Sequence, residues 1–478
     1  MQIVKPDLST RQPRKAGTSI AGVLRGLPTF ARDDRGAMSY LGIMMSVAML
    51  GVGGIGIDLM MTEMKRTKLQ ATLDRAVLAA ANLSQEMSPA AVVNDYVGKA
   101  GMASYVGVPT VTQGLNFTEV MASGTIVQPS NFLQLLGVDT LTATALAAAE
   151  ERIMNVEISM VLDISGSMRD NAKMQNLKNA AKEFVDTVVN EDTHDLVSVS
   201  LVPYSEHVNV GPLIFDELNV NQVHSYSHCI EVPDNQFDDA ALNTNFQFEQ
   251  MQHFQWNFSG SNDRSDTVCP RYDYERIRPF SQNANQLKSQ IDQFSPRAGT
   301  SIFLGMKWGT ALLDPSTRSM VTNWIGDNEV DTELAGRPVA YSDPETLKTV
   351  ILMTDGMNDR SHRIQDWAYN APNEYAHWSR YNLNFYLQNY VSWNQRGLFF
   401  EQKYTAAQGD GLLDDICDAA KAQGIVVWSI GFEVTNHGAD VMEDCASSPS
   451  HFFRVEGIEI SEAFQSVART INQLRLTQ

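Results

Sequence analysis

Residues 158–168 read ISMVLDISGSM, an apolar run that stops at an acid and two hydroxyls. The apolar part predicts a buried strand, because such runs suit a strand that is covered on both faces. Asp163, Ser165 and Ser167 then follow at alternate positions. A core strand has no use for three oxygen-bearing side chains, so we expect them to hold a ligand where the strand ends.

The chain after residue 155 repeats this alternation of strand and helix. Strands are predicted at VEISMVLDI, LVSVSLVPYS, LKTVILMTDG and GIVVWSIGF, with helical spacing of apolar residues between them. The alternation predicts an α/β fold with a doubly wound, mostly parallel sheet that helices cover on both faces. Ligands of such sheets bind beyond the carboxyl ends of the strands, where the strand order reverses.

A second acid occupies the same kind of position as Asp163. Asp355 follows the apolar run VILMT, at the carboxyl end of another predicted strand. Carboxylates and hydroxyls are the hard oxygen donors that Mg²⁺ prefers, with water completing the octahedron. A helix-cap role would explain one serine but not two acids at strand ends. The sequence therefore predicts a magnesium site, with Mn²⁺ or Ca²⁺ as alternatives.

The pattern D-x-S-x-S, with a later Thr in GTSIFLG and a later Asp in TDG, resembles the metal-ion-dependent adhesion site of von Willebrand factor A domains. Thr300 takes the Thr position. The resemblance implies that Ser165, Ser167 and Thr300 ligate the cation directly, while Asp163 and Asp355 act largely through water. It also implies that a carboxylate of a partner protein completes the coordination.

The amino-terminal part of the chain predicts a membrane anchor. Residues 36–57, GAMSYLGIMMSVAMLGVGGIGI, carry no charge and match the ~20 residues that cross a bilayer. A cleaved signal peptide would have a shorter apolar region. Residues 1–35 form a basic leader, whereas the whole chain has a net charge of −20. That acidic balance argues against a nucleic-acid partner.

The charge and hydropathy pattern divides the chain into consecutive segments. Leu69, Leu73 and Val77 lie at four-residue steps, which predicts an amphipathic helix continuing from the anchor. The predicted layout is a basic cytoplasmic leader (1–35), a transmembrane helix (36–57), a helical stalk (58–89), a small strand-rich module (90–150) and an A domain (151–478) with insertions at 211–280 and 359–410.

The chain contains four cysteines, none in a C-x-x-C pair, and four cysteines allow three connectivities. Cys229 is close in sequence to Cys269, and Cys417 to Cys445, so we favour these two disulfides. An oxidising compartment fits this arrangement, and four buried free thiols remain the alternative. Basic residues flank both ends of the apolar segment, so the local charges leave the orientation open.

The segment RDDRGAMSYLGIMMSVAML, the stretch GTSIFLGMKWGTALLDP and the final INQLRL resemble TadE/TadG-like proteins of the tight-adherence (Flp) pilus assembly system. The resemblance implies a single-pass protein of the bacterial inner membrane whose carboxyl-terminal domain is periplasmic. It also implies a pilus-assembly component as the partner. We expect no enzymatic role, because Ser165 stands where a phosphatase motif has its second acid and no G-x-S-x-G elbow surrounds the serines. A metal-dependent hydrolase using the same oxygens, and a surface adhesin, are the alternatives.

The second predicted insertion is rich in aromatic residues. These side chains could form a core of their own, or they could act as anchors in a protein interface. The candidate partner-binding residues are Trp367, Trp378, Tyr381, Tyr386 and Trp393. In the first insertion, HSYSHC places His224 and His228 beside Cys229, which would suit zinc if the segment were helical.

Overall fold

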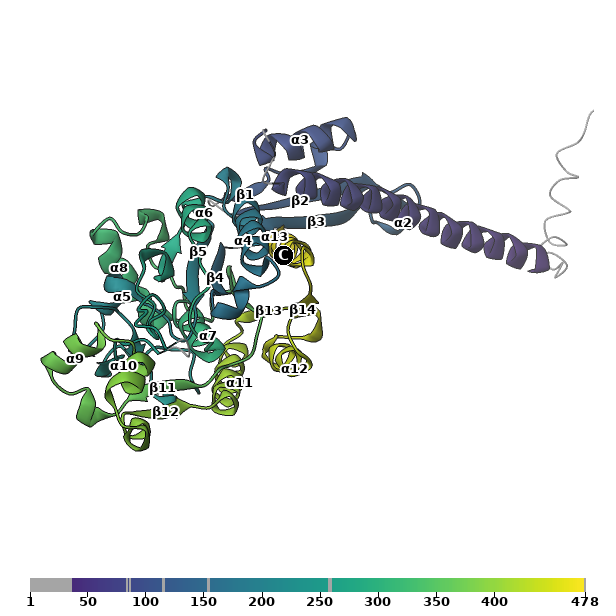
Figure 1. Cartoon of the computed structure of the whole chain (residues 1–478). Helices are drawn as coiled ribbons and strands as arrows, with labels where there is room; N and C mark the ends of the chain where they lie inside the picture. Colours follow the sequence, from purple (N-terminus) through teal and green to yellow (C-terminus); the bar gives the residue numbers. More distant parts are fainter. Residues whose placement is uncertain are drawn as a thin grey trace, which may run out of the picture. The chain divides into compact units, whose positions relative to one another are not determined.

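The computed structural model describes residues 37–82, 85, 87–113, 117–152, 155–256 and 260–476. The predicted basic leader and the first residue of the predicted span lie outside these residues. The chain forms two compact units, an amino-terminal one that ends at Glu150 and a carboxyl-terminal one that begins at Glu151. Figure 1 labels their helices and strands.

The amino-terminal unit is built on the long helix α2 (Ala37–Ala81). Among the described residues it is the one helix long and apolar enough to cross a membrane. Its apolar side chains before Asp58 are largely exposed, with Met45 at 60% and Leu50 at 73%. This helix fits the predicted single-pass anchor.

Beyond Asp58, α2 becomes amphipathic as predicted, because Leu69, Leu73 and Val77 are all buried in the core of this unit. The three strands form one sheet in the order β1-β2-β3, and β2 and β3 run alongside α2 (Figure 1). The other elements of the unit are α3 (Pro89–Lys99), η3 (Ala103–Tyr105), β1 (Thr110–Gln113), β2 (Phe117–Pro129), η4 (Leu133–Leu136) and β3 (Thr140–Arg152).

The carboxyl-terminal unit is organised around a six-stranded sheet in the order β14-β13-β10-β4-β5-β9. Strands β14 to β5 pair in parallel, and β9 pairs antiparallel with β5. The predicted α/β class is confirmed, and the sheet is mixed because of β9. The strands are β4 (Asn155–Asp163), β5 (Val197–Tyr204), β9 (Arg278–Ser281), β10 (Thr346–Thr354), β13 (Val426–Phe432) and β14 (Phe452–Val455).

Helices cover both faces of this sheet. Alternate residues of a strand point to opposite faces, and those of β4 enter two separate hydrophobic cores. Met160 packs on one face, with Phe184 and Phe464 among its core partners. Val161 packs on the other face, with Trp308 and Leu413. The helices are α4 (Lys173–Val188), α6 (Ala284–Asp292), α7 (Ile302–Ala311), α8 (Arg318–Gly326), α11 (Ala406–Ala422), α12 (Asn436–Cys445) and α13 (Glu459–Leu476).

The topology fixes the position of the candidate site. From β4 the chain proceeds to β5 on one side, and it later returns to β10 on the other side of β4. The carboxyl ends of β4 and β10 therefore flank the point where the strand order reverses. That point is where an open parallel sheet leaves room for a ligand.

The two insertions pack against each other. Phe254 and Val268 of the first share a core with Ile364, Trp378 and Leu383 of the second. Their elements are α5 (Gly211–Phe215), β6 (Val220–Asn221), β7 (Ile230–Glu231), β8 (Phe248–Gln250), β11 (Ser361–Ile364), α9 (Pro372–Trp378), α10 (Leu383–Tyr390), η12 (Trp393–Leu398) and β12 (Phe400–Tyr404).

Two predicted insertion boundaries need correction. Strand β9 pairs with β5 at the edge of the main sheet, so the first insertion ends before Arg278 instead of at residue 280. Helix α11 begins at Ala406 and covers the sheet, so the second insertion ends before residue 410. The four residues of β9, RPFS, carry no apolar alternation that would have identified a strand.

Candidate metal centre and partner cleft

Asp163 is the last residue of β4, and it is fully buried. One of its carboxylate oxygens accepts the backbone N–H of Ser165 at 2.7 Å. The other accepts the hydroxyl of Thr354, the last residue of β10, also at 2.7 Å. The acid is therefore held between the ends of two adjacent strands.

The second predicted acid, Asp355, joins Asp163 through the two serines. Ser167 Oγ donates to Asp355 Oδ1 at 2.6 Å, and the Ser165 and Ser167 hydroxyls lie 3.0 Å apart. Both acids are buried, whereas Ser167 is exposed. These four residues, called the oxygen cluster below, thus meet in one place that opens to solvent at Ser167.

Thr300, the fifth predicted ligand, lies in the loop that precedes α7. This loop borders the oxygen cluster, because Gly166 N donates to Ala298 O at 3.0 Å. Thr300 is itself 7% exposed, and its carbonyl accepts the N–H of Asp359 at 2.8 Å. Thr300 thus lies two residues after Ala298, where its loop contacts the cluster.

The electrostatics of the cluster favour a positive charge. Burial raises the pKa of Asp163 to about 7, and the neighbouring Asp355 carboxylate acts in the same direction. Hydrogen bonds from Ser165 and Thr354 lower the pKa of Asp163 by smaller amounts. Two carboxylates that share a buried site repel each other, and a cation relieves that repulsion.

A lysine that sequence reasoning did not identify also contacts the oxygen cluster. Lys173 Nζ lies 3.0 Å from Asp355 Oδ2 and 3.9 Å from Glu433 Oε2. Lys173 is the first residue of α4, where the helix dipole disfavours a positive charge. The sequence did contain a signal for this contact. A lysine in the first turn of a helix is unfavourable unless acidic groups lie near it.

The donor set fits a hard divalent cation. Two carboxylates and two hydroxyls converge with oxygen atoms 2.6 to 3.0 Å apart, and these are donors suited to Mg²⁺ or Mn²⁺. Within the described residues, no group of three or more His, Cys, Asp or Glu has the arrangement of a metal site. A metal ion at the oxygen cluster would therefore be held by hydroxyl oxygens as well as by the two carboxylates.

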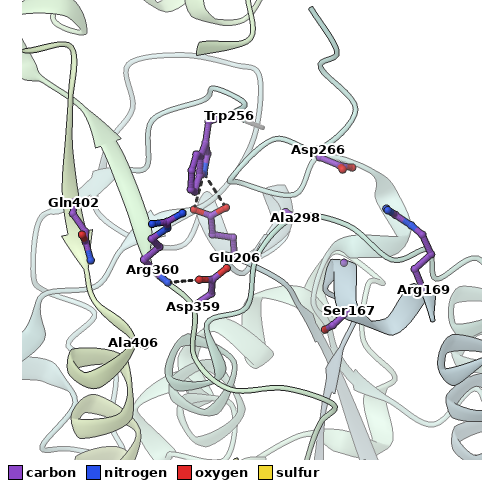
Figure 2. A pocket seen from close by; sticks show the side chains of 12 residues that line it. Ser167, Arg169, Glu206, Trp256, Asp266, Ala298, Asp359, Arg360, Gln402 and Ala406 are labelled. Atoms are coloured by element: carbon purple, nitrogen blue, oxygen red, sulfur yellow. Dashed lines mark hydrogen bonds between the residues drawn. The ribbon is translucent and has the colours of Figure 1, made fainter. Parts of the chain in front are cut away.

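A cleft of about 760 Å³ adjoins the oxygen cluster (Figure 2). Gly166 and Ser167 line one part of it, and Arg360 and Gln402 of the aromatic insertion line another. The cleft therefore connects the cluster with the base of the insertion. Its remaining lining residues are Arg169, Glu206, Trp256, Asp266, Ala298, Gly299, Asp359 and Ala406.

Glu206 is the buried acid of this cleft, and sequence reasoning did not identify it. It accepts hydrogen bonds from Trp256 Nε1 at 3.2 Å and from Ser361 Oγ at 2.9 Å. Burial raises its pKa to about 7, although both hydrogen bonds and Arg363 act in the opposite direction. Glu206 follows a buried strand without a recognisable motif, so only the fold reveals its environment.

The predicted aromatic anchors divide into two groups. Trp378 is 3% exposed and lies in the shared core of the insertions, where its Nε1 donates to Ala368 O at 2.8 Å. This corrects the expectation that Trp378 meets a partner. Tyr381 and Tyr386 are half-buried. Trp367 and Trp393 are exposed, at 55% and 83%.

Both predicted disulfides are present. Cys229 pairs with Cys269, and Cys417 pairs with Cys445, with Cα atoms 5.8 and 5.1 Å apart. Cys229 is therefore no thiolate, which contradicts the zinc interpretation of HSYSHC.

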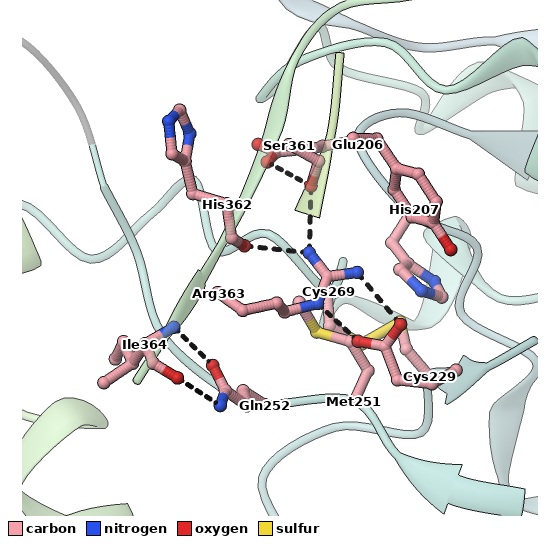
Figure 3. Close-up of polar contacts among 12 residues, drawn as sticks. Glu206, His207, Cys229, Met251, Gln252, Cys269, Ser361, His362, Arg363 and Ile364 are labelled. Atoms are coloured by element: carbon pink, nitrogen blue, oxygen red, sulfur yellow. Dashed lines mark hydrogen bonds and ion pairs between the residues drawn. A yellow bond between two sulfur atoms is a disulfide. The ribbon is translucent and has the colours of Figure 1, made fainter. Parts of the chain in front are cut away.

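Beside the first disulfide, Arg363 forms an ion pair with Glu231 and donates to Ser361 Oγ (Figure 3). The ion pair joins the base of the aromatic insertion to the first insertion, which contains this disulfide.

Comparisons with known proteins match two parts of the chain. Residues 36–83 match the family of Flp pilus-assembly TadE/G-like proteins, as the amino-terminal resemblance predicted. No curated protein matches the chain. Its structural neighbours include von Willebrand A domains and pilus proteins.

Three solved structures illustrate these neighbours. The von Willebrand factor domain of the pilus tip protein Mfa5 from Porphyromonas gingivalis is 13% identical, with 68% of this chain and 98% of that chain covered and a TM-score of 0.36. The pilus adhesin SpaC from Lactobacillus rhamnosus GG is 14% identical, with 77% and 34% covered and a TM-score of 0.35. The von Willebrand factor type A protein from Catenulispora acidiphila is 10% identical, with 77% and 50% covered and a TM-score of 0.28. The TM-scores are low, so the description of the fold rests on the topology above.

Proposed function

We propose that this protein is a membrane-anchored component of a Tad/Flp pilus system that binds a partner protein through Mg²⁺ at the oxygen cluster. The pilus-assembly match at residues 36–83 and the long apolar helix α2 support the setting. The observation that carries the binding role is the convergence of two buried acids and two serines where the strand order reverses.

The bound cation would supply a coordination position for an acidic side chain of the partner. The chain's own residues would fix where that side chain arrives, because the cluster opens to solvent at Ser167 and leads into the cleft. Any carboxylate can ligate Mg²⁺, so specificity must come from a second surface. The cleft reaches the base of the aromatic insertion, whose exposed Trp367 and Trp393 suit that role.

We further infer that the carboxyl-terminal unit is periplasmic. Its four cysteines all form disulfides, which persist in oxidising compartments. Alkylation of the unreduced protein by a maleimide tests this location, since labelled cysteines would contradict the oxidised state.

Calorimetry with Mg²⁺ tests the metal site. In the full-length protein in detergent, Asp163→Ala should abolish Mg²⁺ binding, because it removes the acid that accepts from both Ser165 and Thr354. Asp170→Ala is the matched control, since Asp170 is an exposed acid in the same loop. Unchanged affinity in Asp163→Ala would show that the oxygen cluster is not the site.

Partner binding is tested separately, by capture from membranes with and without a chelator. The captured partner should be lost when the chelator is added, and it should also be lost with Asp163→Ala. A partner that stays bound without the cation would contradict the metal-dependent part of the proposal.

A further inference from the structure

The loop between β2 and β3 carries exposed apolar residues. Residues 131–138, NFLQLLGV, contain no charge. Leu135 is 84% exposed and Leu136 is 69% exposed, both within the short helix η4. Isolated exposed leucines are common on soluble proteins, so their meaning depends on where the loop lies.

The loop is fastened to α2 by one carboxylate. Asp58 accepts the backbone N–H groups of Asn131 at 3.1 Å, Phe132 at 2.7 Å and Leu133 at 3.0 Å. Asp58 is 2% exposed, because the loop covers it. A buried carboxylate is costly unless it is hydrogen-bonded, so this contact fixes the loop at one position along the helix.

A glycine of α2 makes room for the loop. A Cβ atom at Gly54 would lie 2.2 Å from Cδ1 of Phe132, so the aromatic ring packs directly on the helix backbone. The loop is closed at its base, where Ser130 N donates to Asp139 O at 3.0 Å and the Ser130 hydroxyl donates to Val138 O. The loop is thus held beside residues 54 to 58 of the helix.

This position is the end of the uncharged segment of α2. The segment runs to Ile57, and Gly54 lies three residues before it, about 5 Å inside the apolar length at 1.5 Å per residue. Beyond Asp58 the next charged residue of the helix is Glu63. Apolar side chains of interfacial segments enter the headgroup boundary by ~5–10 Å, and the contact of Phe132 with Gly54 lies about as far inside the apolar length of α2.

We propose that the β2–β3 loop inserts Leu135 and Leu136 into the boundary of the bilayer that α2 crosses. The occupant of this surface is lipid, because the loop continues the apolar surface of the helix at the same level, where Ile57 is 50% exposed. Helix α2 and the β2–β3 loop would thus both attach the amino-terminal unit to the membrane, and together they would fix how deeply this unit lies in it.

This inference rests on the proposed membrane span, and it is independent of the metal site and of the partner. Spin labelling of the full-length protein in vesicles of phosphatidylethanolamine and phosphatidylglycerol tests the loop insertion and the membrane span separately. All four native cysteines form disulfides, so a nitroxide reagent labels only an introduced cysteine. Collision of the label with oxygen reports lipid, and collision with a nickel chelate reports water.

Three positions make the measurement decisive. Leu135→Cys tests the loop, and Leu136→Cys repeats the test on a second exposed residue. Leu146→Cys is the matched control, because Leu146 is a 59% exposed leucine on β3 whose carbonyl accepts from Gln70. Gln70 lies about 24 Å beyond Gly54 along the helix, at 1.5 Å per residue. Met45→Cys, at an exposed position of α2, reports the span itself.

We expect the oxygen-to-nickel collision ratio to be several-fold higher at residue 135 than at residue 146, and high at residue 45. A high ratio at 45 with equal ratios at 135 and 146 would overturn the loop insertion alone. A low ratio at 45 would overturn the span. A label at 135 that neither reagent reaches would show that protein, such as a second copy, covers the loop, and would also overturn the proposal.

Discussion

The aromatic insertion and the β2–β3 loop place their apolar residues in opposite ways. In the insertion, Trp378 and Leu383 are 3% and 2% exposed, and they pack against residues of the other insertion. In the loop, Leu135 is 84% exposed, and the next residue, Leu136, is 69% exposed. A segment of nearly fifty residues with a second segment beside it can enclose a core, whereas an eight-residue loop cannot. Apolar character alone therefore does not tell a structural residue from a binding residue.

The largest expected effect tests whether the insertion has a core of its own. Trp378→Ala should lower the free energy of unfolding of the carboxyl-terminal unit by about 3–5 kcal/mol, because it leaves a cavity in a packed cluster. Trp393→Ala should change it by less than about 0.5 kcal/mol, since that side chain is 83% exposed.

Urea unfolding of the full-length protein in detergent measures both variants. All seven tryptophans lie between Trp256 and Trp428, so intrinsic fluorescence reports the carboxyl-terminal unit. Equal destabilisation by the two substitutions would show that the insertion does not divide into core and surface, and the comparison with the loop would fail.

A second prediction concerns Glu206, which ties the insertions to the main sheet through Trp256 and Ser361. Its pKa is raised in the folded state from 4.5 to about 7, so the folded protein retains a proton that the unfolded chain releases. Ionisation of Glu206 therefore lowers the free energy of unfolding as the pH rises from 4.5 to 7, by up to about 3 kcal/mol.

Glu206→Gln removes this ionisation. The variant should match the wild type below pH 4.5 and should be more stable above pH 7, as measured by urea unfolding across that range. Glu401→Gln, at an exposed acid of the aromatic insertion, should leave the pH dependence unchanged. A parallel pH dependence of Glu206→Gln and the wild type would mean that another group titrates.

The sequence identified the features that depend on local patterns. The apolar run ending at Asp163 and the acid after VILMT predicted two strands whose ends meet, and the structure brings both acids together with Ser165 and Ser167. Proximity in sequence was enough to pair the cysteines correctly. The charge-free segment and the four-residue spacing of Leu69, Leu73 and Val77 predicted the two parts of α2.

The features that the sequence did not reveal depend on contacts between distant residues. Glu206 meets Ser361, which is 155 residues away, and Lys173 meets Asp355, which is 182 residues away. Strand β9 has four residues and takes its place from pairing with β5. Composition could not show which aromatic residues face inward, because that depends on the other insertion.

The smallest expected effect concerns the loop, and it uses two adjacent glycines of α2. Gly54→Ala adds a methyl group where Phe132 lies 2.2 Å away, whereas Gly53→Ala adds one where no atom lies within 4 Å. Overpacking costs about 1–3 kcal/mol, and the better helix propensity of alanine offsets up to about 1 kcal/mol of it. Gly53→Ala has the same propensity gain without the clash.

Hydrogen exchange of the full-length protein in vesicles reads out the difference at the amides of Phe132 and Leu133, which donate to Asp58. We expect exchange about tenfold faster in Gly54→Ala, the factor that corresponds to about 1.4 kcal/mol of local opening, and unchanged in Gly53→Ala. Equal exchange in both variants would show that the loop does not rest on the helix at Gly54. The exposed leucines would then have no fixed depth. The contrast between an insertion that forms a core and a loop that binds the membrane would no longer hold for the loop.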